Sequence, residues 1–330
     1  MGYFERKEYY HQLEMKLSSK VILYVTGDQK QWETQIHPEV LDYFAEHLDT
    51  IGKVNKISLV LYSRGGNTLA AWSLVNLIRQ FCKEFEVIVP SKAQSAATLM
   101  CLGANKIIMT KQATLGPIDP SVNTPLNPHI PGAPENMTLP VNVEAIKGFI
   151  EMVKKDFGVT NKNDMTLITK ELMSYIHPLV LGEVYRARAQ IKMLANKLLS
   201  KQITEKKQID KITSFLCSES GSHDYTINRT EALKELRLPI VKPDDDLYGI
   251  IKKLYKDFSN ELSLNKDYSP IDLLGADMQK QYSKKRALLE SINFGSHYFV
   301  TEGSLTKMPH PNGIAINDNR IFEGWRHEHV

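Results

Sequence analysis

Three short stretches of this 330-residue chain combine residue types that could carry out acyl transfer. Two of them, "SRGGN" (63–67) and "AQSAAT" (93–98), each lie at or just after an apolar run, and "LGPIDP" (115–120) comes soon afterwards. A serine becomes a nucleophile when a base removes its proton and backbone N–H groups face the oxyanion that forms on the substrate. A helix beginning at Ser95 would supply such N–H groups, because the first amides of a helix have no partner within it.

Spacing alone leaves two interpretations of Ser95 and of the glycines before it. Serine is among the preferred helix N-cap residues, so a plain cap explains Ser95 without any chemistry. Two adjacent glycines allow backbone to approach a ligand, but they also suit an ordinary turn between a strand and a helix. The glycines form neither a GxGxxG nor a GxxxxGK[ST] pattern, so a nucleotide site is not supported.

The elements around these stretches alternate between strands and helices. The apolar patterns predict strands at residues 20–28, 56–62, 85–91 and 106–110, and helices at residues 37–52, 68–81 and 95–104. This alternation favours a parallel sheet with crossover helices. The carboxyl ends of parallel strands meet at one edge, where ligands bind, so we expect the first two stretches to lie there together.

A second part of the chain has a different pattern. Residues 122–140 are rich in proline and asparagine and are expected to form a long loop. Further patterns predict helices at 141–158, 179–202, 228–238 and 243–262, and short strands at 297–303, 313–319 and 322–328. We therefore divide the chain into a core, residues 1–240, and a C-terminal extension of helices and short strands, residues 241–330.

The bulk composition excludes several classes of protein. A net charge of +3, with 42% hydrophobic and 24% charged residues, is typical of a soluble globular protein and gives no reason to expect a nucleic-acid partner. The 3 cysteines form no CxxC pair, which argues against a disulfide framework and for a reducing compartment. No segment looks like a signal peptide or a membrane span, so we expect a cytoplasmic protein with no integral membrane segment. The histidines show no metal-binding pattern, and we expect neither a metal nor a cofactor.

The order of three longer motifs is similar to a known family. "LYSRGGNTLAAWSLVNLIR", "VPSKAQSAATLMCLGANKIIM" and "ATLGPIDPSV" together resemble the serine dehydrogenase proteinase family of the Clp/crotonase superfamily, whose members are related to signal peptide peptidase A. The motifs "HPLVLGEVYRARAQIKMLANKLL" and "GSHDYTINRTEALKELRLPI" agree, so that the resemblance covers residues 20–240. It implies an α/β protein with a Clp/crotonase-like core of repeated β-β-α and β-α units around a parallel sheet, followed by a helical C-terminal part.

The resemblance also implies roles for individual residues. Ser95 would be the nucleophile, and the backbone N–H groups of Gly65, Gly66 and Ala96 would form the oxyanion hole. The chain would be a serine endopeptidase that acts on a peptide or protein substrate, and it would assemble as a homo-oligomer.

The base is less well indicated, because related peptidases use either a Ser–Lys dyad or a Ser–His–Asp triad. Lys147, which has apolar neighbours in "VNVEAIKGFI", is our first choice, although a lysine acts as a base only if burial lowers its pKa. It could instead be a solvated lysine on an amphipathic helix. The alternative base is His223; Asp224 would orient it only if the segment is not extended, and Asp119 could orient a base or close its own turn.

Three functions remain open at this point. The first is a serine peptidase that hydrolyses peptide bonds through an acyl-enzyme on Ser95, without ATP because the sequence has no ATPase motif. The second is a catalytically inactive Clp-fold protein used for interaction or assembly. The third is a crotonase-type acyl-CoA enzyme, which would not need a serine at this helix start.

Overall fold

The computed structural model of the chain consists of two compact units. It describes residues 2–118, 121–132, 137–219, 222, 224–264, 266–310 and 313–328. Unit 1 comprises residues 1–116 and 226–330, and unit 2 comprises residues 117–225. These bounds differ from the boundary at residue 240 that the sequence patterns suggested, because the chain after residue 240 adds strands to the sheet of unit 1.

Unit 1 is built on an 8-stranded sheet in the order β10-β5-β3-β2-β1-β11-β12-β13. Its strands are β1 (Lys20–Thr26), β2 (Val54–Tyr62), β3 (Cys82–Val89), β5 (Lys106–Met109), β10 (Ile240–Val241), β11 (Gln279–Ser291), β12 (Gly295–His310) and β13 (Gly313–Glu328). The first five are parallel to one another, whereas β11 to β13 are antiparallel to each other and β11 is antiparallel to β1. The predicted α/β class with a parallel sheet is therefore confirmed.

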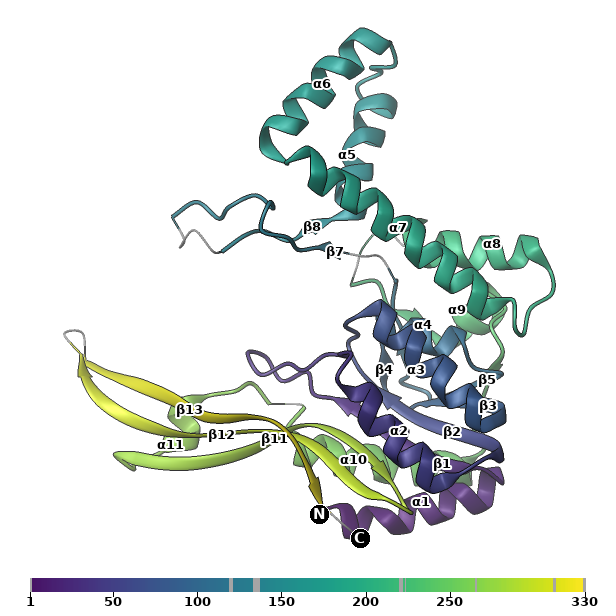
Figure 1. Cartoon of the computed structure of the whole chain (residues 1–330), viewed down its shortest axis with the longest axis vertical. Coiled ribbons are helices and arrows are strands. Elements are labelled where there is room, and N and C mark those ends of the chain that lie inside the picture. Colours follow the sequence, from purple (N-terminus) through teal and green to yellow (C-terminus); the bar gives the residue numbers. More distant parts are fainter. Residues whose placement is uncertain are drawn as a thin grey trace. The chain divides into compact units, whose positions relative to one another are not determined.

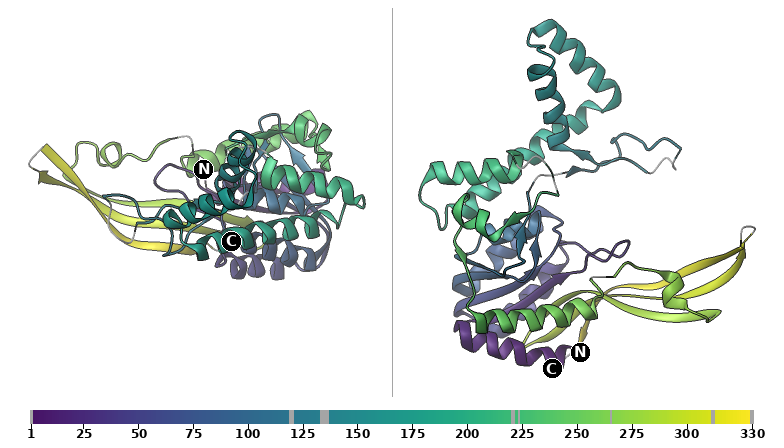
Figure 2. Two further views of the ribbon diagram at one scale, coloured as in Figure 1. Left: turned by 90° about the horizontal axis from the view of Figure 1, so that it is seen from above. Right: turned by 180° about the vertical axis from the view of Figure 1, so that it is seen from behind.

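Helices cover both faces of this sheet (Figure 1). The helices of unit 1 are α1 (Tyr3–Leu17), α2 (Val40–Ile51), α3 (Thr68–Phe81), α4 (Ala96–Leu102), α9 (Arg229–Lys234), α10 (Asp245–Glu261) and α11 (Pro270–Leu274). Helices α1 and α10 lie side by side on one face (Figure 2). Alternation along β1 explains this packing: Val21 and Leu23 join the core beneath α1 and α10, whereas the ring of Tyr24 packs edge-to-face on Phe44 of α2.

The C-terminal strands differ from their prediction. They are 13, 16 and 16 residues long rather than short. Only residues 287–291 of β11 pair with β1, and the rest of β11 pairs with β12 alone, so that β11 to β13 continue past the core as a three-stranded ribbon (Figure 1). Much of this ribbon is open to solvent on both faces, so its strands carry mixed polar residues and lack the apolar runs by which buried strands are recognised.

A 3-stranded sheet lies at the carboxyl edge of the large one, in the order β4-β6-β9. Its strands are β4 (Lys92–Ala93), β6 (Thr114–Leu115) and β9 (Ile227–Asn228). Because β4 leads directly into α4, this small sheet fixes where the "AQSAAT" helix begins.

Unit 2 is mostly helical. Its elements are β7 (Ser121–Val122), β8 (Val141–Asn142), α5 (Val143–Lys155), α6 (Lys162–Tyr175), α7 (Pro178–Leu199), α8 (Lys206–Ser214) and a π-helical turn, Phe215–Glu219. The expected loop at 122–140 is closed at its base by pairing of β7 with β8, and the Asn127 amide donates to the carbonyl oxygens of Val122 and Leu139. No helix among the described residues is long and apolar enough to cross a membrane.

Candidate active site

Ser95 lies on a sharp turn between β4 and α4. Its backbone has φ 51° and ψ −119°, a region that residues other than glycine rarely adopt and that costs about 1–3 kcal/mol. The Gln94 N–H donates to the Ser63 carbonyl at 3.0 Å, and the Ala97 N–H donates to the Gln94 carbonyl at 2.9 Å. These bonds hold Ser95 in the strained conformation, which resembles the strand-to-helix turn that presents the nucleophile in α/β-hydrolases.

The Ser95 hydroxyl does not cap the helix. Ser95 occupies the N-cap position of α4, but its side chain accepts no hydrogen bond from the first amides of that helix. Among the described residues it has no other hydrogen-bond partner, and it is only partly buried. A structural cap therefore does not account for this serine, and its hydroxyl is available for chemistry.

Gly65 allows two backbone segments to meet beside Ser95. It has φ 110°, and a Cβ atom there would lie 2.7 Å from Ser95 Cβ and 3.1 Å from the Ala96 nitrogen. Only glycine fits at this distance and in this conformation. The Gly65 N–H donates to Ser63 Oγ at 2.9 Å, so this amide already has an acceptor.

Gly66 and Ala96 carry amides that are not engaged within the described part of the chain. Ile36 donates to the Gly65 carbonyl at 2.9 Å and accepts from the Asn67 N–H at 2.8 Å. In such a parallel bridge the intervening residue directs its own N–H away from the partner, so the Gly66 N–H points away from Ile36. The Ala96 N–H is the first of α4. Two such donors are what an oxyanion hole requires.

Ser63 and Thr26 hold this arrangement in place, and the sequence analysis did not single out either of them. Ser63 is fully buried, and its Oγ accepts from Thr26 Oγ1 at 2.7 Å as well as from Gly65. Its backbone bridges to Ala93 of β4. Ser63 therefore joins the ends of β1 and β2 to the strand that precedes Ser95; the only sequence signal was its place immediately before "RGG".

Thr98 anchors α4 from the other side. Its Oγ1 lies 2.8 Å from the carbonyl oxygens of both Ala93 and Gly116, and it accepts from the Gly116 N–H at 3.1 Å. Thr98 is fully buried. The last residue of "AQSAAT" thus ties the helix to β4 and to the end of β6, a role that its position alone could not reveal.

A partly buried ion pair lies at the same edge of the sheet. The Lys92 ammonium is 2.6 Å from Asp28 Oδ2, which also accepts from the Tyr62 hydroxyl at 3.0 Å. Burial, and then the negative charge of Asp28, raise the pKa of Tyr62 well above its ordinary value. Lys92, the lysine nearest to Ser95 in the chain, is therefore committed to a carboxylate.

The candidate bases belong to unit 2 or lie outside the described residues. Lys147 is on α5, with its ammonium 3.7 Å from Glu144 and 3.5 Å from Glu151. Asp224 is exposed, and its N–H donates to Ser222 Oγ at 3.2 Å. Asp119 and His223 lie outside the described residues. The structure thus brings together, within unit 1, Ser95, Gly65 and the unengaged amides of Gly66 and Ala96. The identity of the base remains a prediction.

The described residues contain no group of three or more His, Cys, Asp and Glu side chains that could hold a metal ion. The three cysteines Cys82, Cys101 and Cys217 are free thiols. Burial raises the pKa of Cys101, which makes it a poor nucleophile.

Two curated relatives come from Methanocaldococcus jannaschii, and both are uncharacterized proteins. MJ0137 is 29% identical over 62% of this chain and 60% of its own length. MJ1495 is 35% identical over 20% of this chain and 23% of its own length. The chain therefore spans less than two thirds of the relatives that it matches.

Solved structures with a similar arrangement include two proteases. One is the 1510-N membrane-bound stomatin-specific protease, a lysine-to-alanine mutant in complex with a substrate peptide, at 18% identity and a TM-score of 0.36 over 69% of this chain and 78% of that one. The other is ClpP1 from Listeria monocytogenes, at 16% identity and a TM-score of 0.37 over 71% of this chain and 99% of that one.

A family model matches residues 47–135, and it describes a ClpP-like SDH-type serine proteinase. The matched segment contains the glycine turn and Ser95, the parts that are assembled in unit 1. This confirms the resemblance that the motifs predicted: the segment around Ser95 has the sequence signature of the ClpP-like SDH-type serine proteinases.

Proposed function

We propose that the chain is a serine peptidase that hydrolyses peptide bonds through an acyl-enzyme on Ser95. The observation that carries this proposal is the strained backbone of Ser95, at φ 51°, with a hydroxyl that does not cap its helix. Strain of this kind persists only where the surrounding structure enforces it, and here it has no evident structural use.

In the proposed reaction, Ser95 Oγ attacks the substrate carbonyl carbon and gives its proton to a base. The carbonyl oxygen becomes an oxyanion, which the N–H groups of Gly66 and Ala96 stabilise; one such donor contributes about 100- to 1,000-fold in rate. The C–N bond then breaks, the amine leaves with the proton, and water hydrolyses the ester. Gly65 would contribute by letting its backbone lie close to Ser95. Its N–H could join the oxyanion hole only if its hydrogen bond to Ser63 Oγ opened.

Lys147 is the base that we favour. It can accept the Ser95 proton only as a neutral amine, whereas in the structure its ammonium is paired with the carboxylates of Glu144 and Glu151. A working dyad therefore requires Lys147 to leave both carboxylates when it engages Ser95. His223, with Asp119 or Asp224 as its orienting group, is the alternative.

The substrate class that we propose is an extended or unfolded peptide segment, taken without ATP. A short fluorogenic peptide should then be hydrolysed at the same rate with and without added ATP.

A fluorophosphonate probe, which reacts with activated serines, tests the proposal. Wild-type protein should be labelled and Ser95→Ala should not be, whereas Ser73→Ala, a serine within α3, should be labelled normally. Lys147→Ala should slow labelling while Lys155→Ala does not, since Lys155 is a matched control that pairs with the same Glu151 at 3.3 Å.

The alternatives make different predictions for the same panel. If only His223→Ala slows labelling, the base is His223 and not Lys147. If wild-type protein is labelled at no pH and cleaves no peptide, the peptidase proposal is wrong, and the inactive assembly function is favoured.

A further inference from the structure

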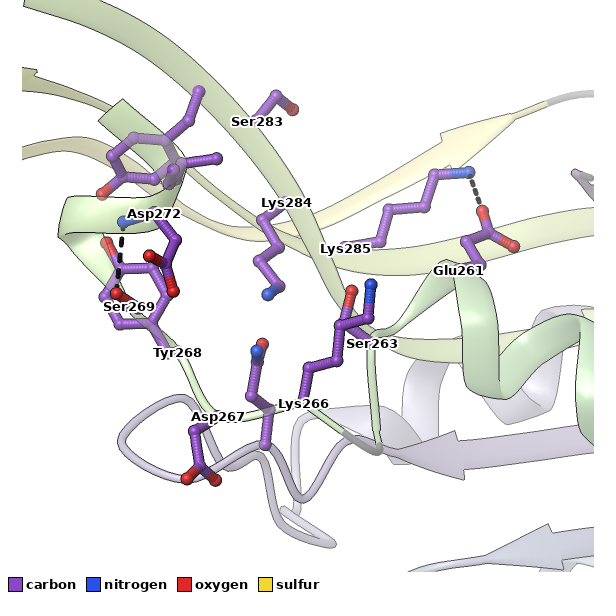
Figure 3. Close-up of a pocket in the computed structure, with 13 residues that line it drawn as sticks. Glu261, Ser263, Lys266, Asp267, Tyr268, Ser269, Asp272, Ser283, Lys284 and Lys285 are labelled. Atoms are coloured by element: carbon purple, nitrogen blue, oxygen red, sulfur yellow. Dashed lines mark hydrogen bonds and ion pairs between the residues drawn. The ribbon is translucent and has the colours of Figure 1, made fainter. Parts of the chain in front are cut away.

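A cavity in unit 1 lies beside the part of β11 that continues past the core (Figure 3), and none of the residues that line it belongs to the turn around Ser95. Its volume is about 930 Å³. It is lined by Gln29 from the segment after β1, by residues between 261 and 273, and by residues 282–285 of β11. Three lysines line it, Lys266, Lys284 and Lys285, and their surroundings differ.

Lys285 is paired, whereas Lys284 is not. The Lys285 ammonium lies 3.0 Å from Glu261 and 3.6 Å from Glu328. Lys284 is half-buried, and no described carboxylate lies within ion-pair distance of its ammonium. Figure 3 shows Lys285 directed at Glu261, while Lys284 points into the cavity between Tyr268 on one side and Lys266 on the other. Two adjacent lysines of one strand thus have opposite electrostatic environments.

The groups around Lys284 are aromatic rings and other cations. Its ammonium is 5.5 Å from the centre of the Trp32 ring and 5.8 Å from that of Tyr268. The guanidinium groups of Arg286 and Arg320 lie 5.3 Å and 5.2 Å from the same Trp32 ring. Burial, and then the positive charge of Arg286, lower the pKa of Lys284. The faces of the Trp32 and Tyr268 rings attract a cation, but the Lys284 ammonium shares the Trp32 ring with the guanidinium groups of Arg286 and Arg320.

Gln29 gives a second, independent sign of a missing ligand. It is 5% exposed and lines the cavity, yet its amide makes no hydrogen bond to any described residue, and its Oε1 is fully buried. A buried amide without a partner costs free energy, and native structures rarely tolerate it unless another molecule supplies the bond.

From this geometry we propose that Lys284 is a carbonyl-reactive amine, and that the cavity binds small aromatic aldehydes as Schiff bases. The Lys284 nitrogen adds to the aldehyde carbon to give a carbinolamine, which loses its oxygen as water when the C=N bond forms, so that the step needs no oxidant or reductant. The aromatic body would pack against Tyr268, and the Gln29 amide would donate to the carbinolamine oxygen through its Nε2, since its Oε1 is fully buried. A lysine without a counter-ion beside another cation is suited to this chemistry.

The test is reductive trapping of the full-length chain with benzaldehyde and sodium cyanoborohydride, followed by peptide mapping with mass spectrometry. Lys284 should be benzylated at least about fivefold faster than Lys285, because Lys285 must first break its ion pairs with Glu261 and Glu328, and an ion pair of ordinary strength is worth roughly that factor. Lys266, which is exposed and contacts no ring, measures the reactivity of an ordinary lysine in the same cavity.

Three further measurements decide the result. Labelling of Lys284 should saturate with benzaldehyde, and should be slower with propanal, which has no ring to pack against Tyr268. Ser95→Ala should leave it unchanged, which separates this proposal from the peptidase proposal. Equal labelling of the three lysines, or a linear dependence on benzaldehyde concentration, would overturn it. Since wild-type protein gives these ratios, no variant at Lys284 is needed.

Discussion

At the scale of residues, the candidate active site combines one side chain with backbone groups of the residues beside it. Ser95 supplies the hydroxyl, and the amides of Gly66 and Ala96 are the donors without acceptors in the described structure. Gly65 contributes because it has no side chain, since a Cβ atom there would collide with Ser95. The hydroxyl of Ser63 then fixes the turn. The small residues next to Ser95 allow the backbone of the glycine turn to approach it closely.

We predict that Gly65→Ala abolishes most of the activity of Ser95. Alanine at φ 110° is strained, and its Cβ would lie 2.7 Å from Ser95 Cβ, so the turn has to shift. A displacement near 1 Å at a nucleophile costs on the order of 100-fold in rate. The rate of fluorophosphonate labelling measures this effect.

Gly52→Ala is the matched control for that variant. Gly52 has φ 71°, but a Cβ there would have no atom within 4 Å. It therefore carries the same kind of backbone strain without a collision. If both variants label at the wild-type rate, close approach at Gly65 has no catalytic role.

At the scale of elements, α1 is attached to the sheet by a buried ionic cluster. Tyr3, Arg6, Tyr10 and Leu13 form its buried stripe, with Arg6 in an apolar position. The Arg6 guanidinium pairs with Glu290 of β11 at 2.6 Å, with Asp257 of α10 at 2.7 Å, and with Glu261. Because the stripe contains a charge, the apolar pattern does not reveal this helix, and we did not predict it. The cluster joins the two ends of the chain.

We expect Arg6→Met to destabilise unit 1 strongly. It leaves Glu290 and Asp257 buried without a cation, which typically costs about 3–5 kcal/mol. Lys16→Met, also on α1, breaks only an exposed ion pair with Asp244 at 3.1 Å and should have a much smaller effect. Urea unfolding at pH 7 measures both, and equal losses would contradict the role of the cluster.

The same cluster predicts how stability changes with pH. Burial acts to raise the pKa of Glu290, but the charge of Arg6 and hydrogen bonds from Arg6, Tyr10 and Ser296 outweigh it, so that its pKa is below the ordinary value. An unfolded glutamate has a pKa of about 4.3. The contribution of Glu290 is therefore complete above that pH and is lost as the pH falls through the lower, folded value. In Arg6→Met this loss should vanish or reverse.

At the scale of the whole molecule, unit 2 presents helices whose apolar residues are not covered. Helix α6 has no buried residue, and isolated helices of its length are marginal in water. Large exposed side chains on α6 and α7 include Leu167, Tyr175, Leu179 and Tyr185. This is the expected surface of a subunit interface, and it agrees with the homo-oligomer that the resemblance implies.

We predict that the chain self-associates through α6 and α7. Light scattering should give a mass above that of one 37.6 kDa chain, and the double variant Leu167→Glu, Tyr185→Glu should reduce it. Met15→Glu is the control, because Met15 is 74% exposed on α1 of unit 1. A wild-type monomer, or an equal effect of the control, would exclude this interface.

The parallel core and the serine turn could be predicted from the sequence because their signals are local. An apolar strand, a turn and a helix follow each other within a few residues. The motifs "SRGGN" and "AQSAAT" come at the ends of successive predicted strands, which places both at the carboxyl edge of a parallel sheet. The lengths of the C-terminal strands were underestimated because much of the ribbon is open to solvent and its strands lack the apolar runs of buried strands. The pairing of β11 with β1 was not predicted either, because the paired residues lie more than 250 positions apart and no local pattern encodes that pairing.

What the sequence determined by itself was therefore the place of the candidate nucleophile, Ser95, at a strand-to-helix junction, and of the glycine turn before it, since both depend on residue type and on neighbours in the chain. Only the tertiary structure decided which amides remain free. The Gly65 N–H is taken by Ser63 Oγ, while those of Gly66 and Ala96 have no acceptor in the described residues. It also decided that Ser95 does not cap α4. Hydrogen bonds between segments that are distant in the chain depend on how those segments pack together, so they cannot be predicted from spacing along the sequence.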